Sequence, residues 1–178
     1  MKKCLPVLIA TFSAAVSLPT LANPANVEGH RIGAGFSKTK DVTAGFDLGL
    51  GGGLKLEYGY ELNHIFGFNV SYQGFGESWG DANVDGSVFK ADTDIGYAFD
   101  LQEFSIKPYV ALGLAQVNEK FSIDGIPGSG DLSDTSFLFG FGARATFMHN
   151  FYADMRFDYL MTEYSDLDQF SMSFGYKF

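Results

Sequence analysis

Apolar and polar residues alternate along most of this sequence beyond residue 30. Successive side chains of a β-strand point to opposite faces, so each alternating stretch predicts a strand with one apolar and one polar face. We expect eight such strands, over residues 30–37, 54–62, 65–73, 87–99, 104–117, 136–148, 151–161 and 170–178. No stretch beyond residue 30 has the roughly 20 consecutive apolar residues that a transmembrane helix needs. The sequence therefore predicts an all-β chain.

The composition favours a membrane barrel over a soluble one. The 178 residues include 19 Phe, 9 Tyr and 22 Gly, and the mean hydropathy is close to neutral at +0.03. A lipid-facing barrel has apolar residues outside and small or polar ones inside, so its mean hydropathy lies near zero. A soluble sandwich or lipocalin-like barrel is the alternative, because alternation alone does not show which face meets water. We expect a transmembrane, eight-stranded, antiparallel up-and-down β-barrel with a packed polar interior.

The predicted connections alternate in length. Three are short, near Asn63, Leu101 and His149. The four longer ones cover residues 38–53, 74–86, 118–135 and 162–169. Short periplasmic turns and longer external loops are typical of such barrels. Residues 42–50 also suit a strand, but a ninth strand would put the termini on opposite sides, so we expect a long first hairpin.

The beginning of the sequence predicts export. Lys2 and Lys3 precede an apolar segment at residues 5–18, and Thr-Leu-Ala at residues 20–22 is a small-x-small cleavage site. We expect a signal peptide over residues 1–22, cleaved after Ala22, and one barrel domain over residues 23–178. Cys4 is the only cysteine. The mature chain is therefore expected to have no disulfide and no thiol nucleophile.

Several stretches of the mature chain carry a family resemblance: residues 33–36, 56–63, 68–72, 106–114 and 174–178. They resemble the OmpA/OmpX-like family of small eight-stranded outer-membrane barrels. The resemblance implies a place in the bacterial outer membrane, in contact with its lipid and lipopolysaccharide. That family includes adhesins, serum-resistance factors and membrane anchors and shares no catalytic residues, so the fold does not decide the function.

The last predicted strand alternates aromatic and small residues up to the final Phe178. It resembles the C-terminal strand that the barrel-assembly machinery recognises in outer-membrane barrels. The resemblance implies an assembly signal formed by Phe170, Phe174, Tyr176 and Phe178.

The inward positions of the predicted strands carry charge of both signs. The positive residues are Arg31, Lys55, Lys90, Lys107, Arg144, Arg156 and Lys177, and the negative ones are Glu57, Glu61, Asp92, Asp94, Asp154 and Asp158. Unpaired charges in a narrow lumen are costly, so we expect a hydrogen-bonded network. About eight strands leave room only for packed side chains. A packed core is therefore favoured over a gated ion path or proton relay.

The predicted long connections are acidic. They hold twelve carboxylates against three lysines, a net charge of −9. The acids are Asp41, Asp47, Glu77, Asp81, Asp85, Glu119, Asp124, Asp131, Asp134, Glu163, Asp166 and Asp168, and the lysines are Lys38, Lys40 and Lys120. Nucleic acid and heparin-like polyanions are therefore poor partners. A merely solvated surface, cation binding and binding of a basic host protein remain open.

A calcium site is one hypothesis for residues 81–86. Their sequence, Asp-Ala-Asn-Val-Asp-Gly, matches the start of a Ca²⁺ loop, with Asp81, Asn83 and Asp85 as candidate ligands. The twelfth position is Asp92 rather than Glu, and an ordinary hairpin tip is favoured. We expect no cofactor.

An enzyme is disfavoured by the position of the histidines. His30, His64 and His149 all fall at the predicted short-turn end, whereas an outer-leaflet acyl-transfer site needs a histidine beside its nucleophile. We expect a non-enzymatic surface barrel whose loops contact other molecules, in adhesion or colonisation. The exposed apolar residues expected among the acids are Phe75, Trp79, Phe121 and Ile126. A narrow channel and, less favoured, a lipid-modifying enzyme are the alternatives.

Overall fold

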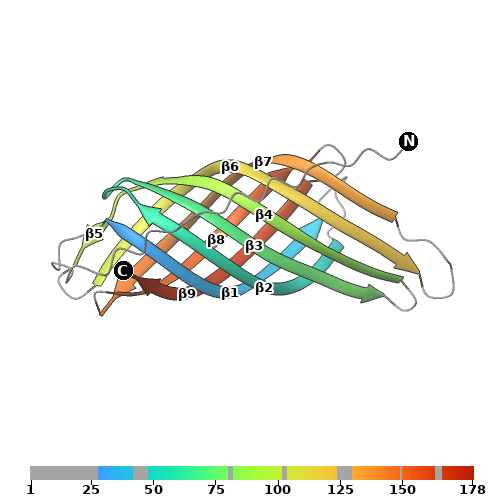
Figure 1. Ribbon diagram of the computed structural model, residues 1–178, viewed down its shortest axis with the longest axis horizontal. Helices are drawn as coiled ribbons and strands as arrows, with labels where there is room; N and C mark the ends of the chain where they lie inside the picture. Colours follow the sequence, from blue (N-terminus) through green and yellow to red (C-terminus); the bar gives the residue numbers. More distant parts are fainter. Residues whose placement is uncertain are drawn as a thin grey trace, which may run out of the picture.

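A closed antiparallel barrel makes up the described part of the protein. The computed structural model describes residues 28–41, 48–79, 82–101, 104–123, 130–148, 150–162 and 166–178. Its strands are β1 (Gly29–Asp41), β2 (Leu48–Glu61), β3 (Phe66–Trp79), β4 (Ala82–Gly96), β5 (Phe99–Asp100), β6 (Phe104–Ile123), β7 (Gly130–Phe147), β8 (Phe151–Met161) and β9 (Asp166–Lys177). Strand β5 is a two-residue addition to β6. The other eight close the barrel, since β1 pairs with β9 and β4 with β6 (Figure 1). The predicted fold is confirmed.

The two ends of the barrel differ. At one end, here called the turn end, β1 meets the end of the chain: the His30 amide donates to the Phe178 carbonyl at 2.9 Å, and the Phe178 amide donates back at 2.8 Å. At the other, the extended end, the tips of β3, β4, β6 and β7 reach furthest (Figure 1). In the described ranges, no helix combines the length and apolar character needed to span a membrane. The predicted signal peptide lies outside the described residues and stays a prediction.

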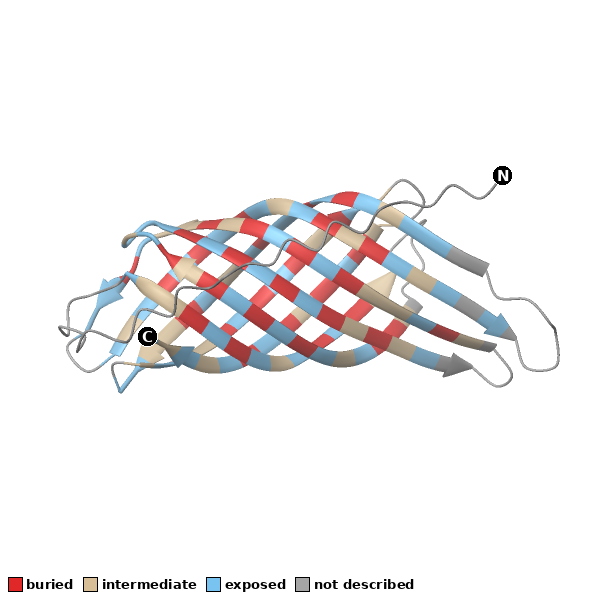
Figure 2. Ribbon diagram, viewed as in Figure 1, coloured by how far each residue is buried: buried red, intermediate tan, exposed pale blue. Residues whose placement is uncertain are grey.

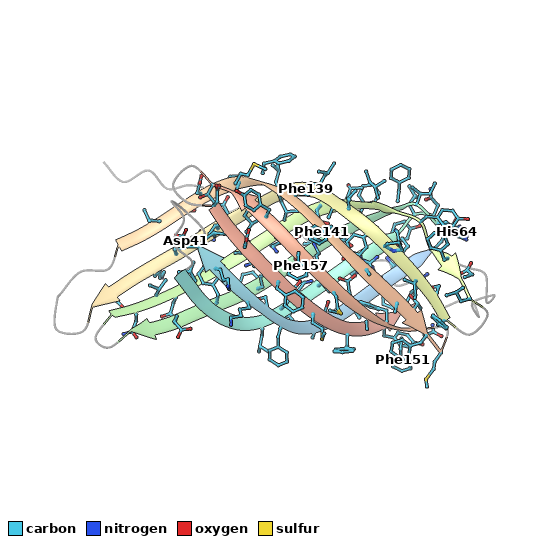
Figure 3. The ribbon with its side chains drawn as sticks, turned by 180° about the vertical axis from the view of Figure 1, so that it is seen from behind. Asp41, His64, Phe139, Phe141, Phe151 and Phe157 are labelled. Carbon is cyan, nitrogen blue, oxygen red and sulfur yellow. The ribbon has the colours of Figure 1, made fainter. Side chains whose placement is uncertain are left out.

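Large apolar side chains cover the outside of the barrel, and Figure 3 shows Phe139, Phe141 and Phe157 among them. Phe141 and Phe157 stack across neighbouring strands with their ring centroids 5.5 Å apart. We call this surface the apolar belt. Its exposed members include Ile32, Phe36, Leu54, Leu56, Phe68, Tyr72, Phe89, Leu112, Leu114, Phe137 and Phe174. An apolar outer wall over a polar interior is the arrangement of a membrane barrel, not of a soluble one.

The apolar residues switch from the outward face to the inward face of the strands where the strands leave the apolar belt. On β4, Phe89 faces outward, whereas Val88 and Val84 are buried inside. On β6, Leu114 faces outward and Val117 is buried. Beyond this boundary the outward positions hold polar residues, such as Asp85 and Asn118, or glycines, such as Gly52 and Gly74. The wall therefore has the polarity of a membrane barrel near the turn end and of a water-soluble barrel at the extended end.

The predicted long connections are wrong in extent, because much of each is strand. Strand β1 continues to Asp41, and β3 pairs with β4 up to the pair Trp79 and Ala82. Strand β6 runs to Ile123, and β9 begins at Asp166. The change of phase hides these extensions in the sequence, since polar residues take over the positions where apolar ones mark the belt. The predicted strand 87–99 also ends earlier, at residue 96, and residue 99 belongs to β5.

A β-bulge accounts for the ambiguous segment before residue 54. Lys38 pairs with Gly52 but Lys40 pairs with Gly49, so two residues of β2 stand opposite Thr39. One of them, Gly51, has a φ of +85°, a conformation that favours glycine. The extra residue turns Leu50 into the barrel, where it is buried. Residues 42–47 lie outside the described part.

Candidate functional site

Charged side chains fill the lumen nearer the turn end. Of the thirteen residues predicted for the interior network, twelve are buried: Arg31, Lys55, Glu57, Glu61, Lys90, Asp92, Asp94, Lys107, Arg144, Asp154, Arg156 and Asp158. The remaining one, Lys177, is half-buried at the turn end. Figure 2 shows buried positions alternating with exposed ones along the long strands of the barrel. The packed polar interior is confirmed.

Arg144 is the centre of one ion-pair cluster. Its Nε donates to Asp154 Oδ2 at 2.9 Å, and its Nη1 pairs with Glu61 Oε1 and lies 3.3 Å from Asp94 Oδ2. Lys107 Nζ bridges the same two acids, at 2.6 Å from Glu61 Oε2 and 2.6 Å from Asp94 Oδ1. The charges of this cluster thus come from five strands: β2, β4, β6, β7 and β8.

Arg31 extends this cluster to β1, the neighbour of β2. Its Nε lies 3.3 Å from Glu61 Oε1, and its Nη1 lies 3.6 Å from Glu57 Oε1. Its Nη2 donates to Asn69 Oδ1, and the guanidinium carbon lies 5.6 Å from the centroid of the Tyr152 ring. Arg31 therefore connects β1 with residues two strands away on either side, on β3 and β8.

Arg156 is the centre of a second cluster, on the side toward the extended end. It binds Asp92 through two parallel hydrogen bonds of 3.0 Å each, and its Nε donates to Asp158 Oδ1 at 2.5 Å. Lys90 Nζ donates to the other oxygen of Asp158 at 2.6 Å. Asn69 donates to Asp92 at 2.8 Å and to an acid of the first cluster at 3.0 Å. One amide therefore joins the two clusters.

Glycines on the inner wall make room for two tyrosines in this network. A Cβ on Gly175 would lie 2.5 Å from the Tyr152 ring, and one on Gly142 would lie 2.7 Å from the Tyr109 hydroxyl. Tyr152 donates to Glu57 at 2.8 Å, and Tyr109 donates to an aspartate at 2.7 Å. Neither tyrosine is among the residues predicted for the network, although Tyr109 alternates with Lys107 and Tyr152 with Asp154, which indicates the same inward face.

An apolar layer lies inside the barrel toward the extended end. Its buried members are Leu50, Phe75, Val84, Val88, Ala115, Val117, Leu138, Leu160 and Leu167. Sequence reasoning missed this layer and expected Phe75 on an exposed loop, which is wrong, because its exposed fraction is 4%. The reversed alternation of the strand extensions is the signal that could have found it. The side chains of Trp79 and Phe121 and all of Ile126 lie outside the description.

The described acids of the extended end lie on strands rather than in loops. They are Asp41 (β1), Glu77 (β3), Asp85 (β4), Glu119 (β6), Asp134 (β7), Asp166 and Asp168 (β9), with Lys38, Lys40 and Lys120 as the cations. Seven acids against three lysines leave a net charge of −4 in this described set. Asp131 lies on β7 but its side chain is not described, and Asp47, Asp81, Asp124 and Glu163 lie outside the described residues. We call this end the acidic rim.

The sequence from residue 8 to residue 178 matches a family model described as the outer membrane protein beta-barrel domain. The chain belongs to this family. Membership confirms the resemblance drawn from the sequence, and with it the bacterial outer membrane as the setting of the barrel. No curated protein sequence matches the chain.

Solved structures show the same barrel. Ail, the attachment invasion locus protein of Yersinia pestis, is 23% identical with a TM-score of 0.65, covering 85% of this chain and 99% of that one. The N-terminal barrel of Pseudomonas aeruginosa OprF is 20% identical with a TM-score of 0.62, covering 85% and 99%. Neisserial surface protein A is 19% identical with a TM-score of 0.62, covering 84% and 97%. At these identities the likeness is one of fold.

The histidines of this outer-membrane barrel lie where the sequence placed them, as far as they are described. His30 lies 2.7 Å from the Tyr58 hydroxyl, and His64 lies 3.8 Å from Asp100 at the same turn end (Figure 3). His149 lies outside the described residues. Ser171 is buried in the lumen and accepts from Lys55 Nζ at 3.2 Å. No histidine of the described chain therefore stands beside a nucleophile at the acidic rim.

A Ca²⁺ loop needs its ligands on a turning loop, but the described candidate ligands lie on a paired strand. Asn83 and Asp85 lie on β4, paired with β3 and β6. Asp92, at the twelfth position, is held by Arg156 inside the lumen. Asp81 lies outside the described residues, and no metal-binding group of three His, Cys, Asp or Glu forms in the remainder. Calcium binding stays the less favoured, untested hypothesis for this segment, and calorimetry with Asp85→Ala tests it.

Glu119 gives the acidic rim a pH dependence. It lies beyond the apolar belt, where partial burial raises the pKa of its carboxyl and the charge of Asp41 raises it further. The Glu119 carboxyl therefore binds its proton more tightly in the folded state than in the unfolded state. The free energy of unfolding falls as pH rises through the folded-state pKa, because the carboxyl then becomes charged in a partly buried place. We expect Glu119→Gln to raise the thermal unfolding midpoint slightly at pH 7 and to leave it unchanged at pH 4, as followed by gel mobility of heated samples. The exposed Glu77→Gln is the control, and an equal shift at both pH values would contradict the assignment.

Proposed function

We propose that this outer-membrane barrel is a non-enzymatic surface protein that holds the acidic rim outside the cell to contact other molecules, in adhesion or colonisation. Barrels of this kind have short turns on the periplasmic side, so the extended end is assigned to the exterior. The observation that carries the proposal is the reversed polarity of the strand extensions. Apolar packing inside and polar side chains outside make the extended end a rigid stalk for the rim.

The charge of the rim favours a basic partner. Glu77, Asp85 and Asp168 are exposed there. Clustered charge of one sign speeds association with a partner of the opposite sign and disfavours partners of the same sign. Ail of Yersinia pestis has been crystallised with the heparin analogue sucrose octasulfate. An acidic rim is unsuited to such a polysulfate, so we propose a basic host or surface protein as the partner here.

Neutralising the rim is expected to reduce adherence. In Glu77→Gln with Asp85→Asn and Asp168→Asn, we expect about tenfold weaker binding, since exposed ion pairs contribute about 0.2–1 kcal/mol each. Cells displaying each form would be tested on immobilised host matrix and serum proteins at low and physiological salt. The difference should shrink as salt rises, because exposed charges are screened.

A matched variant separates charge from loss of display. Thr93→Ala changes an outward residue within the apolar belt and should adhere like the native barrel. Native cells should also pass through heparin–agarose without retention. Equal adherence of the neutralised and native forms, at equal surface display, would rule out the rim as the contact surface.

The final strand supports a proposed role in assembly. Phe174, Tyr176 and Phe178 face outward on or just after β9 and are exposed. Phe170 packs against Phe157, with ring centroids 4.7 Å apart. We infer that the aromatic residues at positions 170, 174, 176 and 178 are presented along one face to the barrel-assembly machinery before the barrel closes.

A further inference from the structure

Uncharged amide and hydroxyl side chains lie in a strip on the outer wall, just beyond the apolar belt. Gln116 and Asn118 project outward from β6, and Ser133 and Thr135 from β7. Gln116 is paired with Thr135 across the two strands, and Asn118 with Ser133. We call these four residues the amide strip. Its members carry no charge, in contrast to the acidic rim.

Hydrogen bonds hold the amide strip in one arrangement. Thr135 Oγ1 donates to Gln116 Oε1 at 2.7 Å, and Gln116 Nε2 donates to Ser133 Oγ at 2.9 Å. Ser133 Oγ in turn donates to Asn118 Oδ1 at 3.0 Å. Gln116 Nε2 also donates to the Asp134 carbonyl at 3.1 Å, so both of its N–H donors are used. A primary amide has two N–H donors and two acceptor sites, so Gln116 retains an acceptor site and Asn118 retains its N–H donors for an external ligand. A fixed orientation lowers the entropic cost of binding.

The position of the amide strip identifies the layer that it meets. Leu114 is the outward residue just before Gln116, and Phe137 is the one just after Thr135; their exposed fractions are 56% and 51%. A strand rises about 3.3 Å per residue, so the strip starts within about 7 Å of the belt along each strand. It faces sideways, like the belt, and so it meets the headgroup layer of the surrounding outer leaflet rather than a partner above the rim.

The chemistry of the strip fits sugars in that layer. Phosphates are held by lysine and arginine, and the strip has neither. Sugar hydroxyls both donate and accept, so they can accept from the Asn118 amide and donate to the side-chain oxygens of the strip. We propose that the amide strip binds the core sugars of the lipopolysaccharide molecules that surround the barrel. This proposal does not depend on the adhesive role of the rim.

Two glycolipids that differ only in their sugars provide the test. The native barrel would be refolded into bilayers containing lipopolysaccharide with its core, or lipid A without it. Both keep the acyl chains and lipid A phosphates. We expect a higher thermal unfolding midpoint with the core sugars. Gln116→Ala with Asn118→Ala should lose most of that core-dependent increase, whereas Thr93→Ala should retain it.

A measurement on the native barrel covers the case in which the double variant fails to fold. The side-chain amide resonances of Gln116 and Asn118 should shift between lipid A and the full core. Equal midpoints in the two glycolipids, unshifted amide resonances, or an increase that survives in the double variant would overturn the proposal. So would a midpoint in lipid A that rises with the protein-to-lipid ratio, which would indicate a second barrel against the strip.

Discussion

Replacing Arg144 with leucine is expected to lower the free energy of unfolding by about 3–5 kcal/mol, the usual cost of removing one partner from a buried ion-pair network. Arg144 pairs with Glu61, Asp94 and Asp154, all of which are buried. Leucine fills much of the same space but leaves these carboxylates with fewer cations. Lys107 still reaches two of them, but Asp154 loses its ion pair with the guanidinium.

Equilibrium unfolding of the refolded barrel in urea, followed by circular dichroism, measures this loss. Arg144→Leu with Asp154→Leu removes a positive and a negative charge together and should recover part of the stability. Lys38→Leu, an exposed lysine beyond the belt, should change stability little. A loss below about 1 kcal/mol, the ordinary range for a surface residue, would show that the cluster does not depend on Arg144.

The sequence predicts the belt region of this fold well, because two signals coincide there. Large apolar residues mark the outward face and charges mark the inward one. Strand β8 is found with its observed bounds, and the inward charges on it, Asp154, Arg156 and Asp158, are buried as expected. A shift of a strand by one residue would move its inward charges to the lipid-facing side. The face on which each belt residue lies is therefore strongly determined.

The strand extensions are harder to predict, because their polarity is reversed. Val84, Val88 and Val117 continue the strands but face the lumen, while polar residues such as Asn118 face outward. Acidic and glycine-rich stretches of this kind also occur in loops. The bulge at Gly51 adds a further shift of phase between the residues before and after it.

The pairing inside the lumen also lies beyond sequence reasoning. Alternation gives the face of each residue and its height along the barrel, but not its position around the circumference. Arg144 and Glu61 are 83 residues apart, and their strands lie on different parts of the wall. Which charges meet depends on strand order and stagger together. The sequence therefore predicts a network of opposite charges without its partners.

The lumen, filled with side chains, is expected to block solutes: refolded barrel in a planar bilayer should show no stable conductance of porin size, and liposomes containing it should not take up sugars. Porins have 16 or more strands, whereas about eight leave space only for side chains. Here the ion-pair clusters around Arg144 and Arg156 are followed by the apolar layer, so two different barriers lie in series.

A variant with smaller side chains in the apolar layer tests whether the ion-pair clusters alone keep sugars out. Phe75→Ala with Leu138→Ala removes bulk from the apolar layer but leaves the ion pairs in place, and it should remain closed to sugars. Brief, small currents are compatible with a closed barrel, because Lys107 contacts both Glu61 and Asp94 and can exchange between them. Steady conductance or sugar uptake by the native barrel would favour the channel function instead. Since an unpaired ion in a dry interior costs several kcal/mol, the paired and closed arrangement should dominate at equilibrium.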